Sequence, residues 1–338
     1  MKHYSIVEIL GDGISSELSQ SVHRLTQDLP FKVDFRQVDL SLENRRQNKD
    51  QAYANAQSAL GELRVALKYP TVTEEESPNK LLRELCGFSV IHRPVMTFPG
   101  VENNFKRTLD IDVVRIATGG TYSDRGMRIG TETAVSVRVI ERQPARHAAR
   151  FAFRLASSKG TSVVSTSKWT IQAAADGLFQ DQCDEIADHY PGIQHRSELF
   201  DALLAGIILQ PDRYSVIVCP NEYGDFLSDM ACGLIGSIGL GDSASYAFET
   251  GGRIKLAMFD PAGGTAPDIA GQDKCNPSAA LLAFGSLLNH IGERKSGEAV
   301  RNSVRDAITD GDKTRDIGGE LGTQAFTEAV ASRLREKL

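Results

Sequence analysis

Asp225 and Asp229 lie four residues apart in the segment that runs from Asn221 to Asp229. If this segment is helical, both carboxylates project from the same face. Carboxylates offer the oxygen ligands that Mg²⁺ and Mn²⁺ prefer. A solvated helix face is the more common role of such a pair, but the largely apolar stretches at 215–219 and 234–240 argue against full exposure. The spacing therefore predicts a partly buried site for a divalent cation.

The segment from Asn221 to Asp229 stands in a chain whose sequence alternates between strand-like and helix-like runs. Short β-rich runs occur at residues 4–9, 31–35, 112–116 and 214–218, and longer runs of helical period separate them. Such alternation predicts an α/β layered fold. Residues 133–140 alternate apolar and polar side chains and predict an exposed strand, whereas residues 143–157 predict an amphipathic helix rich in alanine and phenylalanine.

The composition narrows the class of protein. A chain of 338 residues predicts two lobes that share a sheet or pack together. The net charge of -6 gives no global electrostatic reason to bind nucleic acid. The five cysteines lack any C-x-x-C spacing, which favours a reducing, cytoplasmic compartment over a zinc or disulfide framework. No apolar run approaches the roughly 18 residues of a membrane helix, so we expect a soluble protein without a membrane partner.

Several ordered motifs extend the interpretation beyond the two aspartates. The segment from Asn221 to Asp229 reads N-x-x-G-D-x-x-S-D, and Gly11-Asp12-Gly13-Ile14 with Glu17 stands near the start. Residues 260–271 are followed by Asn276-Pro277, and residues 316–319 read D-I-G-G. Together these motifs resemble the β-decarboxylating dehydrogenases, the isocitrate and 3-isopropylmalate dehydrogenase family, over nearly the whole chain.

This resemblance implies an isopropylmalate dehydrogenase-like α/β fold with two lobes and a central mixed sheet flanked by helices, which is not a Rossmann fold. Residues 1–88 and 236–338 would form the cofactor-binding lobe. Residues 89–235 would form the substrate and dimerisation lobe, with a clasp arm near 130–165 that holds a second subunit. The expected assembly is a homodimer with composite active sites.

The resemblance also implies a role for each matching polar residue. Tyr122 would be the catalytic proton donor and Lys168 the catalytic base. Asp225, Asp229 and Asp201 would hold Mg²⁺ or Mn²⁺, with Asp201 and Lys168 reaching the site of the neighbouring subunit. The substrate would be bound by Ser77, Asn79, Arg83, Arg93 and Arg115.

For the dinucleotide, the implied residues form one glycine-rich stretch, which comprises Asp260, Gly263, Gly264, Thr265, Ala266, Asp268, Ile269 and Asn276. An aspartate at position 268 can accept hydrogen bonds from a ribose diol and would repel a 2′-phosphate, which favours NAD over NADP. Gly263 stands where the family commonly has a histidine, and Thr170 stands where it commonly has an asparagine. Trp169 replaces a small residue beside Thr170.

The implied activity is NAD-dependent oxidative decarboxylation of a 3-substituted malate to a 2-oxo acid and CO₂. The run Ser77-Pro78-Asn79-Lys80 is similar to the isocitrate branch and favours a polar or anionic 3-substituent, such as a further carboxylate or a phosphonate. Residues 118–120 and 316–323 are instead similar to the isopropylmalate branch, so 3-isopropylmalate, tartrate and malate stay as alternatives. A noncatalytic partner subunit of a heteromeric dehydrogenase is the alternative from another class.

Overall fold

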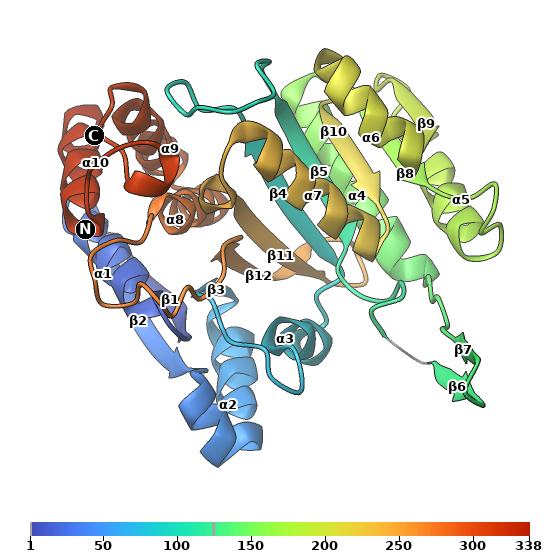
Figure 1. Ribbon diagram of the computed structural model, residues 1–338, viewed down its shortest axis with the longest axis horizontal. Coiled ribbons are helices and arrows are strands. Elements are labelled where there is room, and N and C mark those ends of the chain that lie inside the picture. Colours follow the sequence, from blue (N-terminus) through green and yellow to red (C-terminus); the bar gives the residue numbers. More distant parts are fainter. Residues whose placement is uncertain (1, 124–125) are drawn as a thin grey trace.

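The computed structural model describes residues 2–123 and 126–338. It is built around a ten-stranded mixed sheet with helices on both faces (Figure 1). The strands are β1 His3–Leu10, β2 Lys32–Asp39, β3 Val65–Lys68, β4 Val90–Met96, β5 Asp110–Ile116, β6 Met127–Ile129, β7 Thr133–Val135, β8 Val163–Ser167, β9 His195–Leu199, β10 Val216–Cys219, β11 Asp242–Phe248 and β12 Ile254–Pro261. The helices are α1 Ser15–Thr26, α2 Leu42–Leu63, α3 Pro78–Cys86, α4 Arg142–Lys159, α5 Ala175–Ala187, α6 Phe200–Leu209, α7 Asn221–Ile235, α8 Ser278–His290, α9 Arg294–Thr309 and α10 Thr323–Lys337.

The order of the main sheet is β2-β1-β3-β12-β11-β4-β5-β10-β8-β9. Its outer strands pair in parallel, whereas β11 runs antiparallel to both β12 and β4, and β4 runs antiparallel to β5. Strands from the start, middle and end of the chain therefore meet at the centre of one sheet. The predicted α/β class with a central mixed sheet is confirmed.

Both faces of the sheet are buried, and the strand sequences show why. Along β1, Ile6 joins the core beneath α1 and α8, whereas Val7 and Ile9 join a second core beneath α2. This pattern is expected for strands that carry helices on both sides. Among the described residues, no helix is both long enough and apolar enough to cross a membrane.

The segment around 130–160 differs in part from expectation. The expected strand at 133–140 is shorter, because regular pairing with β6 ends at Val135 and Val139 instead forms a bridge with Gly120. The hairpin of β6 and β7 is exposed and stands away from the main sheet (Figure 1). Helix α4 matches the expected helix and packs its alanine-rich face on β5 and β10. The clasp role and the lobe boundaries stay predictions.

Candidate active site

A cavity of about 340 Å³ lies where α3, β4, β5 and α7 meet. We call it the substrate cavity. The predicted residues that line it are Ser77, Asn79, Arg83, Arg93, Arg115, Tyr122 and Asp225. Because these residues come from α3 with its N-cap, β4, β5, α7 and the loop that carries Tyr122, the fold brings together side chains that are far apart in the sequence.

Arg115 lies near the end of β5 and is 1% exposed. Its guanidinium donates to the carboxylate of Asp225 and, over 2.7 Å, to Oδ1 of Asn221. Gly224 makes this contact possible, because a Cβ at that position would overlap the Cβ and Cδ atoms of Arg115. The glycine of the N-x-x-G-D motif thus lets α7 lie directly against an arginine on the sheet.

Arg93 projects from β4 towards both predicted metal ligands of α7. Its Nη1 lies 3.3 Å from Oδ1 of Asp225 and 3.3 Å from Oδ1 of Asp229, and it donates to Oγ of Ser228 over 2.7 Å. One positive charge therefore already sits between the two carboxylates. The two aspartates converge on a single point where a cation is stabilised.

The three arginines are close enough to repel one another. Burial, followed by the charge of Arg115, lowers the pKa of Arg83 to about 9. Burial acts to raise the pKa of Asp225, but the charges of Arg115 and Arg93 outweigh it and hold that pKa below its ordinary value. The Nε atoms of Arg83, Arg93 and Arg115 are buried without a hydrogen-bond partner within the described part of the chain.

Tyr122 lies at the rim of the cavity, and its hydroxyl donates to Oδ2 of Asp225 over 2.9 Å. Burial, together with this hydrogen bond, raises the pKa of Tyr122 to about 12. Lys80 reaches the same rim from α3, where its Nζ donates to the Tyr122 carbonyl over 3.1 Å. Tyr122 thus keeps its proton near neutral pH.

Helix α3 presents its N-terminus to the cavity. Ser77 caps the helix by accepting a hydrogen bond from the Lys80 amide, and Pro78 occupies the first turn. Asn79 follows, with its buried Oδ1 atom unpartnered among the described residues. These features place amide donors, an amide oxygen and a lysine at one end of the cavity.

Lys168 and Asp201 lie apart from the substrate cavity in this chain. They pair with each other, with Nζ of Lys168 2.8 Å from Oδ1 of Asp201. The Lys168 contact, together with backbone donors, lowers the pKa of Asp201. Across residues 2–123 and 126–338, no three acidic, histidine or cysteine side chains converge as a metal-ligand set. The three-aspartate site therefore stays a prediction that needs a second chain.

The loop at 262–277, which follows β12 and which we call the cofactor loop, packs on the turn between β1 and α1. The Ile14 amide donates to the Thr265 carbonyl over 3.0 Å. At Gly13, φ is +58° and a Cβ would overlap that same carbonyl, so glycine is required there. Asp268 is exposed on the cofactor loop, and Asn276 donates to Asp316 over 2.9 Å.

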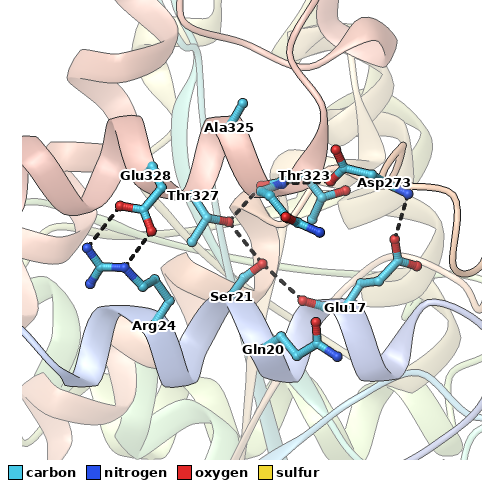
Figure 2. Close-up of a pocket in the computed structure, with 10 residues that line it drawn as sticks. Glu17, Gln20, Ser21, Arg24, Asp273, Thr323, Ala325, Thr327 and Glu328 are labelled. Atoms are coloured by element: carbon cyan, nitrogen blue, oxygen red, sulfur yellow. Dashed lines mark hydrogen bonds and ion pairs between the residues drawn. The ribbon is translucent and has the colours of Figure 1, made fainter.

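Helices α1 and α10 hold the far end of the cofactor loop and enclose a second cavity of about 340 Å³ (Figure 2). Glu17 accepts hydrogen bonds from the amides of Gly271 and Asp273 over 2.7 and 3.0 Å. Across the same cavity, Arg24 forms a two-point contact with Glu328 (Figure 2). Glu17 of the first motif thus has a clear structural task in anchoring the loop.

Sequence reasoning assigned no role to Lys68, which ends β3 and is 1% exposed. Burial lowers its pKa to about 8, opposed by the charge of Asp260 and reinforced by that of Arg83. Burial in turn raises the pKa of Asp260, against the charges of Lys68 and Arg83. Asp260, which lies in β12 just before the cofactor loop, is therefore close to the basic residues. The sequence signal that could have indicated a buried lysine is its place in the short, otherwise apolar run Ala66–Tyr69.

Comparison with known proteins gives a consistent result. Residues 5–330 match the family described as isocitrate/isopropylmalate dehydrogenase. The chain is 33% identical to subunit 2 of the mitochondrial NAD isocitrate dehydrogenase of Saccharomyces cerevisiae, over 98% of this chain and 90% of that protein. It is 34% identical to the 3-isopropylmalate dehydrogenase of Archaeoglobus fulgidus, over 97% and 99%. The crystal structure of isocitrate dehydrogenase from Methylococcus capsulatus superposes with a TM-score of 0.88 at 28% identity, over 98% of this chain and 99% of that one.

Proposed function

The chain belongs to the isocitrate/isopropylmalate dehydrogenase family, and on that premise we propose that it oxidises and decarboxylates a 3-substituted malate with an anionic or polar 3-substituent. Family members are NAD-dependent decarboxylating dehydrogenases. The proposed products are a 2-oxo acid, CO₂ and NADH.

The observation that carries this proposal is the convergence of Arg83, Arg93 and Arg115 on one cavity. Buried polar groups without partners are rare in folded proteins, so a cluster of them suggests a missing ligand. Guanidinium groups match carboxylates in shape and charge. A substrate with two or more carboxylates would give the unpartnered donors of the three arginines their hydrogen-bond acceptors.

The N-terminus of α3 supports an anionic or polar 3-substituent. Ser77 and Asn79 offer polar contacts, and Lys80 adds a positive charge at the exposed rim. The free amides at the start of a helix also favour negative charge. A third carboxylate or a phosphonate fits this end of the cavity better than an isopropyl group does.

Asp225 and Asp229 fit a divalent cation, because both already direct carboxylate oxygens at one cationic point, which is occupied by Nη1 of Arg93. Asp201 would complete the ligand set from another subunit. When bound, Mg²⁺ or Mn²⁺ would supply Lewis acidity at the 2-hydroxyl and at the developing enolate. NAD would supply the hydride acceptor, held along the cofactor loop with Asp268 at the adenosine ribose.

The protein side chains have separate tasks in this proposal. Lys168 removes the proton of the 2-hydroxyl as C2 is oxidised. The arginines hold the carboxylate that departs as CO₂, and Tyr122 then donates its hydroxyl proton to C3. Because Tyr122 lies at the cavity and Lys168 does not, the two tasks fall to residues of different subunits in the proposed homodimer.

Exposed apolar side chains support such a dimer. Phe226 on α7 and Leu209 on α6 are 56% and 67% exposed, and Met127 and Ile129 on the β6–β7 hairpin are also exposed. Apolar surface of this kind commonly marks a protein contact. We propose that α6, α7 and the hairpin contact the second subunit.

The test is NADH formation with Mn²⁺ across isocitrate, homoisocitrate, phosphonomethylmalate, isopropylmalate, tartrate and malate, with CO₂ followed in parallel. We expect one anionic substrate to give NADH and CO₂ together. Arg83→Met should lower its kcat/KM about 100-fold, because a buried charge contact is lost. The exposed Arg294→Met serves as the matched control and should have no effect. NADH without CO₂ would replace the proposal with simple dehydrogenation.

A second candidate is a subunit that acts only with a different partner chain. It is favoured because Lys168 and Asp201 lie outside the substrate cavity of their own chain and because one relative is named as a single subunit of its enzyme. A folded protein that stays inactive with NAD and NADP across the whole panel would favour this candidate.

A further inference from the structure

We propose that Arg138 is a positioning residue that fixes the loops of Tyr122 and Lys168 through two buried carboxylates, Glu222 and Asp176. This inference rests on the proposed function, which gives Tyr122 and Lys168 their catalytic roles. Neither residue lies in a helix or strand. A loop residue that must meet substrate in a fixed geometry needs a rigid support.

The first arm of the network runs to Lys168. Asp176 is fully buried in the first turn of α5, and its Oδ2 accepts a hydrogen bond from the backbone amide of Lys168 over 2.7 Å. Its Oδ1 accepts from Nε of Arg138 over 2.9 Å. Arg138 thus holds the carboxylate that holds the Lys168 loop.

The second arm runs to Tyr122. Glu222 lies in the first turn of α7, is 4% exposed, and pairs with Nη1 of Arg138. Its Oε1 accepts from both the amide and the hydroxyl of Thr121 over 3.2 Å. Gly120 has φ +68°, and a Cβ there would overlap the Glu222 carboxylate. The turn that carries Tyr122 is therefore pressed against Glu222.

The location of Arg138 explains how one side chain serves both arms. The next residue, Val139, pairs with Gly120 through two backbone hydrogen bonds of 2.7 and 3.0 Å, so the Arg138 backbone is tied to the Tyr122 turn. The guanidinium carbon lies 4.7 Å from the ring centre of Tyr223. That ring stacks on Phe200, which precedes Asp201.

The charge of Arg138 is needed as well as its shape. Asp176 and Glu222 together bring two negative charges to a buried region, and Arg138 is 12% exposed beside them. Removal of the guanidinium would leave two buried carboxylates without their shared counter-charge, so the carboxylates would turn towards water. That change would release the amides of Thr121 and Lys168.

Trp169, the single tryptophan of the chain, makes a test possible that does not depend on catalysis. It follows Lys168 directly, so acrylamide quenching of its fluorescence reports how firmly the Lys168 loop is held. We expect Arg138→Met and the isosteric Asp176→Asn to increase this quenching. Glu222→Gln acts on the other arm and should leave it near the value of the unmodified protein. The exposed Arg142→Met is the matched control.

In turnover assays, we expect kcat to fall about 100-fold in Arg138→Met with KM little changed, because the loops shift while the arginine cavity stays intact. Asp176→Asn and Glu222→Gln should each lower kcat, and the two isosteric variants keep the test valid if Arg138→Met does not fold. Quenching and kcat equal to those of Arg142→Met in all three variants would overturn the inference. If no substrate is found, quenching still tests the Lys168 arm, so failure of the proposed function is separable from failure of this inference.

Discussion

Lys80 places a positive charge at the rim of the substrate cavity without entering a buried ion pair. We expect Lys80→Met to lower kcat/KM for substrates with an anionic 3-substituent by about 3- to 10-fold, as for a partly exposed charge contact. The value for 3-isopropylmalate, if that substrate is turned over, should stay unchanged. Steady-state kinetics measures kcat/KM for the anionic substrate and for 3-isopropylmalate, in the variant and in the unmodified protein. The exposed Lys106→Met is the control. An equal fall for charged and uncharged substrates would show that Lys80 does not read the 3-substituent.

Lys68 should make stability depend on pH above neutrality. Its pKa is about 8 in the folded chain, where burial disfavours the charge, and 10.5 is its ordinary value. As pH rises through 8, the folded state loses this proton while the unfolded state keeps it. Stability therefore rises with pH up to about 10.5, with a gain of about 1–2 kcal/mol between pH 7.5 and 9.5.

Urea denaturation of the unmodified protein and of Lys68→Met at these two pH values checks this expectation. The variant should lack the gain. Asp260, Arg83, Arg45 and Asp12 contribute charges around Lys68 and are common to both proteins. Equal pH dependence in both proteins would contradict the prediction.

At the residue scale, the sequence predicts the roles of residues that stand together in one short motif. It does not predict contacts between residues that are far apart in the sequence. Asp225, Asp229 and Gly224 stand together in one segment, and Gly224 indeed lies against Arg115. Lys68 and Arg138 are different, because their partners are distant in sequence and each residue taken alone resembles an ordinary surface charge. Only the folded chain shows that Arg138 pairs with two buried carboxylates and that Lys68 is buried close to both Asp260 and Arg83.

The turn between β1 and α1 supports the cofactor loop at the scale of elements. Gly13→Ala would force a Cβ against Thr265 at a positive φ, so we expect a loss of about 1–3 kcal/mol in stability and weaker NAD binding. Urea denaturation and NADH fluorescence titration measure the two effects. Gly61→Ala in α2, which meets no atom within 4 Å, should instead gain up to about 1 kcal/mol. Unaltered NADH affinity in Gly13→Ala would show that the turn does not support the loop.

Elements with strong local patterns are predicted well. The expected strands near 4–9 and 112–116 and the helix at 143–157 correspond to β1, β5 and α4. The expected strand at 133–140 is too long, because alternation alone does not specify a partner and the chain changes partner at Val139. The place of β12 between β3 and β11 depends on pairings that no local pattern encodes.

The whole molecule is expected to work as a dimer in which each site takes Tyr122 from one chain and Lys168 from the other. Tyr122→Phe and Lys168→Met should each be nearly inactive alone. Co-expression of the two should restore about a quarter of normal activity, because half of the random dimers contain one intact site. The activity of the co-expressed mixture checks this, and affinity-purified mixed dimers should show about half of normal activity. A mixture as inactive as either variant alone would place both residues in one site.

The strand order also bears on how the chain folds while it is synthesised. Strand β3, at residues 65–68, pairs with β12 at residues 254–261, and α1 packs on α10 near the C-terminus. The early strands therefore leave the ribosome long before their neighbours exist. By contrast, β5, β8, β9 and β10 all lie between residues 110 and 219. Until β12 has been synthesised, the backbone groups on one edge of β3 have no strand to pair with. The growing chain is therefore expected to need chaperone protection during synthesis of residues 69–261.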